Sequence, residues 1–209
     1  MRKIEELLRE RILVLDGAMG TMIQRHKLSE EDFRGEVFKN HHQSIKGNND
    51  LLSITRPDII KDIHAAYFAA GSDIVETNTF SGNSIAQEDY DLADYVYQIN
   101  YESAKIAKEV ANEFTAKEPN KPRFVAGSMG PTTKLASMSP DVNNPGFRAI
   151  TFDQLVTAFE EQINGLLDGG VDLLLIETIT DTLNAKAALF AIDTVFKQKG
   201  VEVPIMIFK

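Results

Sequence analysis

Residues 171–177 read Val-Asp-Leu-Leu-Leu-Ile-Glu, an apolar run that ends on an acid. A run of this length and composition is typical of a strand that is buried on both faces of a sheet. Residues 12–16, Ile-Leu-Val-Leu-Asp, and residues 73–76, Asp-Ile-Val-Glu, repeat the pattern. Because a loop and a helical pattern follow each run, the sequence predicts consecutive βα units.

Strand-like runs occur five times along the chain. They begin near Ile12, Asp73, Phe124, Asp172 and Val203. Helical periodicity is found between them, and it covers residues 57–71, 93–115, 151–170 and 182–199. Strands that alternate with helices, without hairpin signals, predict a parallel sheet with right-handed crossovers.

Several local signals mark the ends of these elements. Thr151 and Gln154 form a capping-box pattern at the start of one helix, and Gly71, Gly169-Gly170 and Gly200 are helix stops. Residues 1–10 predict a charged amphipathic helix and not a signal peptide. Residues 24–56 and 128–150 are expected to be two long loops after strand ends, where functional loops gather.

Two fold classes are compatible with five parallel strands. One is a smaller open α/β fold. The other is a (β/α)8 TIM-barrel type, of which this chain holds only about the first five βα units, because a closed barrel needs eight strands and about 250 residues. In the second case residues 1–209 form a single partial barrel domain that is truncated at strand five.

Bulk composition limits the classes of partner. The chain has 209 residues, 43% of them hydrophobic and 25% charged, which is ordinary for a soluble globular domain. A net charge of -9 disfavours nucleic acid and anionic membrane as partners. No apolar run is long enough to span a membrane, so we expect a cytoplasmic protein. The absence of cysteine excludes disulfides and thiolate chemistry within this sequence.

The candidate site is formed by acids at the ends of the apolar runs. Asp16, Glu76 and Glu177 each follow such a run, and in a βα barrel the C-terminal ends of the strands form the floor of the active site. Repeated acids at that position predict a site that holds a cation, an amine or a proton. The structural alternatives are an Asx turn at Asp16 and buried ion pairs at Glu76 and Glu177.

Other polar residues are weaker candidates. Residues 16–21, Asp-Gly-Ala-Met-Gly-Thr, form a glycine-bearing turn that exposes backbone amides, but the Gly-Lys-Ser/Thr ending of a phosphate loop is missing. Ser128 lies in a tight turn and not in a nucleophile elbow. The histidines have no metal-ligand spacing, and we interpret all of them as non-catalytic. They are His26, His41, His42 and His64.

Longer motifs carry a family resemblance. Residues 12–22 resemble the opening of the homocysteine S-methyltransferase domain. Further segments resemble the N-terminal homocysteine-binding module of the cobalamin-dependent methionine synthases. They are residues 32–36, 46–50, 76–80, 139–143, 176–178 and 181–186. The resemblance extends from about residue 10 to residue 207, and the motifs occur in a matching order.

The resemblance implies a (β/α)8 barrel that moves a methyl group from methylcobalamin, ultimately from methyltetrahydrofolate, to the sulfur of L-homocysteine. It also implies folate, cobalamin and activation modules as partners in the full-length enzyme. Asp16 and Glu177 match family positions near the amino group of homocysteine, and the turn amides of residues 17–21 could take its carboxylate. The implied substrate-binding set is Asp16, Gly17, Ala18, Met19, Gly20, Thr21, Glu76, Asn78, Ser128 and Glu177.

The family binds zinc through three cysteines, and this sequence contains none. The resemblance places those cysteines on later strands, beyond residue 209, so no catalytic and no metal-ligating residue is expected within this chain. We therefore expect neither zinc nor methylcobalamin to bind this chain alone, and we expect it to be inactive alone. Two alternatives remain: a non-catalytic truncated fragment, and an unrelated acid-lined TIM-barrel metalloenzyme that acts on phosphorylated sugars.

Overall fold

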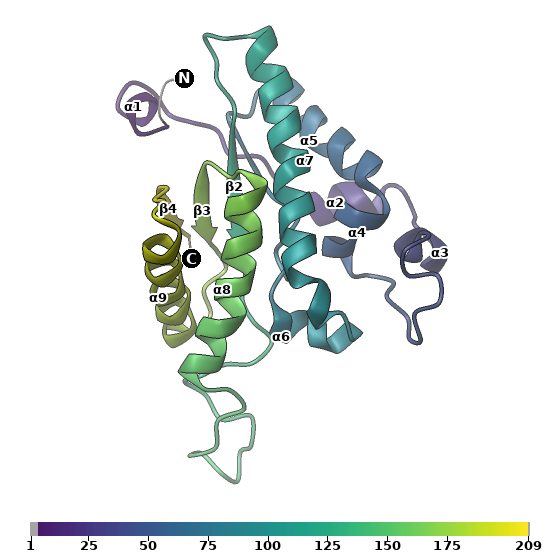
Figure 1. Ribbon diagram of the computed structural model, residues 1–209, viewed down its shortest axis with the longest axis vertical. Coiled ribbons are helices and arrows are strands. Elements are labelled where there is room, and N and C mark those ends of the chain that lie inside the picture. Colours follow the sequence, from purple (N-terminus) through teal and green to yellow (C-terminus); the bar gives the residue numbers. More distant parts are fainter. Residues whose placement is uncertain (1–3, 209) are drawn as a thin grey trace.

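The computed structural model describes residues 4–208, so the first three residues of the predicted N-terminal helix and Lys209 lie outside the described residues. Helices and parallel strands alternate along the chain (Figure 1). The helices are α1 (Ile4–Leu8), α2 (Met19–Gln24), α3 (Glu30–Arg34), α4 (Leu52–Thr55), α5 (Pro57–Ala70), α6 (Ser84–Gln87), α7 (Val96–Lys117), α8 (Phe152–Gly169) and α9 (Thr182–Lys199). Short 3-10 turns are η1 (Asn49–Leu51), η2 (Glu88–Tyr90) and η3 (Ala93–Tyr95). The strands are β1 (Ile74–Glu76), β2 (Phe124–Met129), β3 (Leu173–Ile176) and β4 (Ile205–Ile207).

The four strands form one parallel sheet in sequential order, β1-β2-β3-β4. The first of the five expected strands differs from the prediction, because residues 12–15 contribute only a single parallel bridge, from Leu15 to Ile74. The Asp16 amide donates to the Ile74 carbonyl at 2.9 Å, so the segment still runs beside β1 in the expected order. Ile12 is 87% exposed. Since the pairing is limited to this one bridge, residues 12–15 form no ladder with β1 and are not a strand.

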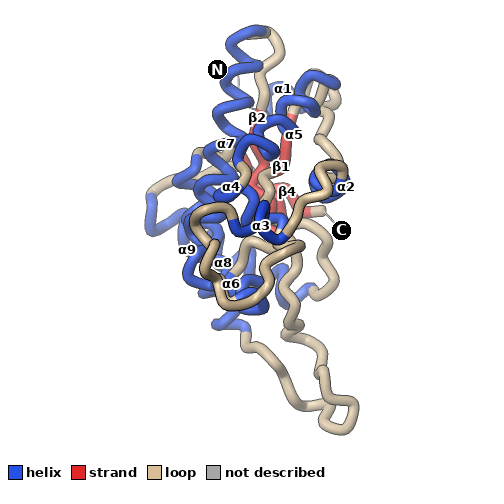
Figure 2. The backbone as a smooth tube through the Cα atoms, turned by 90° about the vertical axis from the view of Figure 1, so that its right-hand side faces the viewer, coloured by secondary structure: helices blue, strands red, loops and turns tan. Residues whose placement is uncertain are grey.

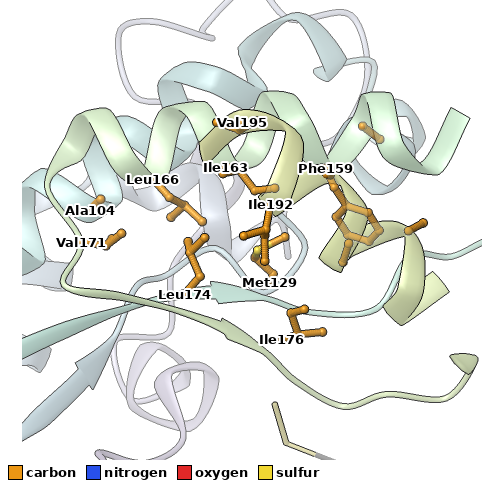
Figure 3. Packing of buried hydrophobic residues seen from close by; sticks show 14 of the residues in the cluster. Ala104, Met129, Phe159, Ile163, Leu166, Val171, Leu174, Ile176, Ile192 and Val195 are labelled. Carbon is orange, nitrogen blue, oxygen red and sulfur yellow. The ribbon is translucent and has the colours of Figure 1, made fainter. Parts of the chain in front are cut away.

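One face of the sheet is covered by helices. Figure 2 shows α7, α8 and α9 on one side of the strands. Figure 3 shows how Leu174 and Ile176 of β3 meet Ile163 and Leu166 of α8 and Ile192 of α9. These side chains belong to one buried apolar cluster. The helical stripes predicted from the sequence therefore supply the main core.

The opposite face of the sheet carries the alternate residues of each strand. Ile74, Phe124 and Leu173 are buried there in a separate cluster with Ile4 and Leu7 of α1. Side chains alternate between faces along a strand, so this two-sided burial is what a parallel sheet requires. The first helix thus packs against part of the second face, through Ile4 and Leu7.

The predicted helix ends are confirmed at four positions. Gly71 ends α5 in the left-handed region at φ 114°, Gly170 ends α8 at φ 94° and Gly200 ends α9 at φ 65°. The capping box at Thr151 and Gln154 is present in full at the start of α8. Glycine carries no Cβ and adopts these left-handed caps without steric cost, so each helix stops where the sequence indicated.

The two predicted loops differ in outcome. The expectation of a loop over residues 24–56 is wrong, because the segment folds into α3, η1 and α4 and buries apolar side chains such as Ile45 and Leu51. A second capping box, between Ser29 and Asp32, starts α3. The second predicted loop, residues 128–150, begins two residues later than expected, because Ser128 and Met129 are the last residues of β2. Residues 130–150 contain no helix or strand and project as a long loop (Figures 1 and 2). Within residues 4–208, no helix is both long and apolar enough to cross a membrane.

Candidate functional site

The predicted acids meet at the C-terminal ends of the strands. Asp16 follows the segment beside β1, Glu76 is the last residue of β1, and Glu177 comes directly after β3. Together with Ser128 of β2 they line one cavity of about 250 Å³. The sequence prediction that these four residues share one rim of the sheet is therefore met in the structure.

The Asp16 carboxylate is tied to the backbone of the neighbouring strand. Its Oδ1 atom accepts a hydrogen bond from the Glu76 amide at 3.1 Å. An Asx turn within its own loop was the alternative interpretation, but this bond reaches 60 residues along the chain. This bond holds the segment that ends at Asp16 against the end of β1, and Asp16 lines the cavity.

Glu177 is positioned from the other side of the cavity. Its amide donates to the Met129 carbonyl at 3.2 Å, and its Oε1 atom accepts from the Ser128 hydroxyl. The next residue, Thr178, has φ 51°, a left-handed conformation that is uncommon for residues other than glycine. Strained backbone of this kind often occurs at functional sites, where it aims a side chain.

The electrostatics of the cavity favour protons on two of its acids. Burial raises the pKa of Asp16 to about 8, helped by the charges of Glu76 and Glu177. Burial also raises the pKa of Glu76 to about 7, again helped by Glu177. No lysine or arginine is among the described residues that line the cavity. A cation that entered would therefore find three carboxylates without a competing positive side chain.

The glycine-bearing turn forms another wall. Gly17, Ala18, Met19 and Gly20 line the cavity, whereas Thr21 is exposed in the first turn of α2 and is not among the lining residues. A Cβ atom on Gly17 would lie 3.3 Å from the hydroxyl of Tyr67. A side chain at this position would therefore require a small shift of the Tyr67 ring.

Asn78 lines the cavity from the loop after β1. Its amide group donates to the Asn49 carbonyl at 2.7 Å, so the segment 46–50 supports this side of the site. Sequence reasoning missed Thr77, Thr79 and Phe80, which also line the cavity. The signal that could have identified them was their position in the same post-strand motif as Asn78.

The residues of this site do not match a zinc centre. The chain has no cysteine, and within residues 4–208 no group of three or more histidine, aspartate and glutamate side chains could hold a metal ion. His64 is fully buried on α5, where burial lowers its pKa to about 4. Since the donors of a tetrahedral site are mainly thiolates and imidazoles, the described donor set does not fit zinc.

Comparison with known proteins supplies a family. The sequence model of the homocysteine S-methyltransferase family matches residues 13–208. Among solved structures, the chain is similar to the homocysteine methyltransferase MmuM from Escherichia coli. The metallated form matches with a TM-score of 0.68 and 20% identity over 94% of this chain, and the oxidized form with 0.69 and 19% over 96%. At this identity the structural likeness establishes the fold, here part of a (β/α)8-type barrel.

The lengths of the matched chains differ. This chain spans 63% of the length of the metallated and oxidized forms of MmuM. The apo form matches with a TM-score of 0.65 over 97% of this chain and 62% of its own length. Nearly all of the present chain is therefore aligned, while more than a third of each relative has no counterpart in it.

Proposed function

The chain belongs to the homocysteine S-methyltransferase family, and from this premise we propose that its cavity binds L-homocysteine so that the substrate sulfur can accept a methyl group. The observation that carries the proposal is the wall of three carboxylates, Asp16, Glu76 and Glu177, with no basic side chain among the described lining residues. Such a wall suits the ammonium group of an amino acid.

The ammonium group is proposed to lie between Asp16 and Glu177. Charge-assisted hydrogen bonds from an ammonium to carboxylates are short and strong, and two acceptors at fixed strand ends define its orientation. The substrate carboxylate is proposed to take backbone amides from the turn at residues 17–20, which line the same cavity. The ammonium and carboxylate groups of the amino acid are thereby both bound, and its thiol side chain remains free to reach the methyl donor.

Protons account for how an acidic cavity stays stable when empty. With pKa values of about 8 and about 7, Asp16 and Glu76 both hold protons to a large extent at neutral pH. A bound ammonium replaces those protons as the compensating positive charge, so binding releases protons. The same acids are therefore neutralised by protons in the empty cavity and by the ammonium group in the occupied one.

The finer assignment is to the cobalamin-dependent methionine synthases, with methylcobalamin as the donor and L-homocysteine as the acceptor. It is supported by the segments 46–50, 76–80 and 139–143 that resemble that group. In this proposal residues 1–209 act as one homocysteine-binding domain, and its partners are the folate, cobalamin and activation modules of the full-length enzyme. The donor chemistry belongs to those modules.

Zinc has no part in the steps proposed for these residues. In the family as a whole a zinc ion supplies thiolate formation, and MmuM has been solved in a metallated form. The described donors here do not fit such an ion. The proposed role of this chain is accordingly limited to binding and orienting the amino acid.

Calorimetric titration with L-homocysteine tests the proposal. Asp16→Asn and Glu177→Gln should each weaken binding about tenfold or more, because a hydrogen bond to a charged group is worth roughly 1.5–3 kcal/mol. Asp89→Asn and Glu36→Gln, at exposed positions, serve as charge-matched controls. The analogue 4-mercaptobutyrate, which lacks the amino group, should bind the two cavity variants and the wild type equally. Unchanged homocysteine affinity in both cavity variants would refute the clamp.

A further inference from the structure

The loop after β1, residues 77–82, is held by polar side chains from several separate elements. The Asn78 amide donates to the Ser103 hydroxyl at 2.8 Å. Gln162 donates to the Thr79 carbonyl at 3.1 Å, and Asn100 donates to the Gly82 carbonyl at 2.6 Å. This loop carries Asn78 and Phe80, two residues of the cavity wall. Its conformation is therefore imposed by side chains outside the cavity.

The tip of the loop is held by Asp50 and Gln87. Gln87 donates to the Ser81 carbonyl at 3.1 Å, and the Asp50 carboxylate accepts from the Ser81 amide at 3.4 Å. The Phe80 amide also acts on this carboxylate, since it counters the rise of the Asp50 pKa. Among the side chains that hold this loop, that of Asp50 is the one that can ionise.

A close contact on the opposite side restricts the same tip. A Cβ atom added to Gly130 would lie 2.3 Å from the Phe80 carbonyl oxygen, so the loop backbone presses against the end of β2. Phe80 itself is 43% exposed and borders the cavity. The tip is thus in contact with both Asp50 and the backbone at Gly130.

We propose that Asp50 is a positioning residue of the homocysteine cavity: its buried carboxylate holds the amides of Phe80 and Ser81 and thereby sets the wall formed by Asn78 and Phe80. The inference rests on the proposed function, because it assigns Asp50 a role in binding the same substrate. Asp50 does not line the cavity, so it acts through the loop and not by contact with the ligand.

The protonation of Asp50 supports this role. Burial raises its pKa to about 7, against the opposing effect of the backbone amides of Ser81, Asp50 and Phe80. No charged side chain is among the causes of this shift, so the groups that act on the carboxylate are these amides. The strength of the hold on the loop then changes with pH in the neutral range, because an ionised acceptor binds an amide more tightly than a neutral one.

Amide hydrogen exchange, measured by NMR on the 209-residue chain, tests the hold on the loop directly. Asp50→Leu should reduce the protection of the Phe80 and Ser81 amides about tenfold, and Asp50→Asn, which keeps one acceptor oxygen, should reduce it less. The chemical shifts of both amides should titrate with a midpoint near 7 in the wild type and lose that transition in Asp50→Asn. Asp89→Asn, an exposed aspartate in the neighbouring η2 turn, is the matched control and should leave all of this unchanged.

Binding of L-homocysteine by the same variants completes the test. Affinity should fall in the order wild type, Asp50→Asn, Asp50→Leu, following the loss of amide protection. Unchanged amides in both variants, or lost protection with full homocysteine affinity, would overturn the inference. If the wild type binds no homocysteine, the proposed function fails, and the amide data alone then decide whether Asp50 positions the loop.

Discussion

The two ends of the sheet carry acids in opposite electrostatic settings. Asp73 and Asp172 come directly before β1 and β3, whereas Glu76 and Glu177 stand at their far ends. The sequence around both strands has the same form, an acid, an apolar run and another acid. The acids before the strands meet cations, and the acids after them do not.

At the N-terminal ends, each acid is fully compensated. Asp73 accepts two bonds from Arg11, at 2.7 and 2.9 Å, and one from the Val14 amide. Asp172 repeats the arrangement, with Lys108 at 2.5 Å and the Val125 amide at 2.9 Å. Burial acts to raise the pKa of Asp73, but the bonds from Arg11 and Val14 hold it below its ordinary value.

At the C-terminal ends, the acids accept hydrogen bonds from the Glu76 amide and the Ser128 hydroxyl, but no cation is among the described residues that line their cavity. The pKa of Asp16 is raised to about 8 and that of Glu76 to about 7, with burial as the main cause in both. Acids that are costly to ionise in the empty protein lower the stability of the fold, and proteins retain such residues mainly where function requires them. The comparison thus separates acids that hold the sheet together from acids that are available to a ligand.

The largest expected effect comes from breaking the compensated end. Asp73→Ala should lower the free energy of unfolding by about 3 kcal/mol at pH 7, because it removes a buried acceptor and leaves Arg11 and the Val14 amide without their partner. The folded-state pKa of Asp73 is depressed, so its contribution is present above the unfolded pKa and is lost as the pH falls through the folded one. Denaturant unfolding at pH 7 and at pH 3 measures both effects.

A surface pair provides the control for this variant. Glu36 pairs with Lys39 at 3.2 Å, and both side chains are largely exposed. Glu36→Ala should therefore change stability by less than about 0.5 kcal/mol. A loss at Asp73 as small as that of the control would mean that the two ends of the sheet do not differ in the way described.

The second effect has the opposite sign. Asp16→Asn should raise the free energy of unfolding at pH 8 by about 1–2 kcal/mol, because it removes a carboxylate that is difficult to ionise in the folded protein. The folded-state pKa is raised, so the unfolded chain binds fewer protons between about pH 4 and pH 8, and wild-type stability falls as the pH rises. The gain should shrink toward zero near pH 3, below the ordinary pKa of 3.8, where Asp16 is mostly neutral in both states. Equal gains at pH 3 and pH 8 would contradict this account.

Much of the architecture could be predicted because it depends on local signals. The ends of α5, α8 and α9 follow from glycine caps and a capping box, and these act within a few residues. The first strand could not be predicted correctly, because the state of residues 12–15 depends on neighbours along both sides and not on their own composition. The short helices of residues 24–56 were missed because each is too short to show a period.

The acids at the C-terminal ends of the strands could be predicted from the sequence, but the residues that support or pair with the acids of this sheet could not. Position after an apolar run identified Asp16, Glu76 and Glu177, since parallel strands bring such residues to one edge. The cations at Asp73 and Asp172 could not be predicted, because Arg11 and Lys108 lie more than 60 residues away in the sequence. The role of Asp50 is equally non-local, since its contacts are backbone amides of another segment.

The third effect is the release of protons on ligand binding, which we expect only from the acids at the C-terminal ends of the strands. Binding of L-homocysteine at pH 7 should release about one proton, because an ammonium favours the ionised forms of Asp16 and Glu76. Affinity should accordingly rise between pH 6 and pH 8. Calorimetry in buffers of different ionisation enthalpy measures the release, with 4-mercaptobutyrate as a ligand that should cause none. Binding of homocysteine without proton release would show that the acids are already ionised in the empty cavity.

The smallest expected effect concerns which cation binds to the three acids at the C-terminal ends of the strands, an ammonium group or a metal ion. Three carboxylates without a basic neighbour could in principle hold a metal ion in place of an ammonium, but tight zinc sites need thiolate or imidazole donors in fixed geometry. The chain has no cysteine, and among the described residues no three or more histidine and acid side chains form a group that could hold a metal ion. We therefore predict that the 209-residue protein holds no stoichiometric zinc and by itself transfers no methyl group to homocysteine, whose thiol, with a pKa of about 8.5, is mostly protonated at neutral pH. Metal analysis of the purified protein after mild chelation provides the test, and one tightly held zinc per chain would mean that acids and histidines form a metal site at the rim.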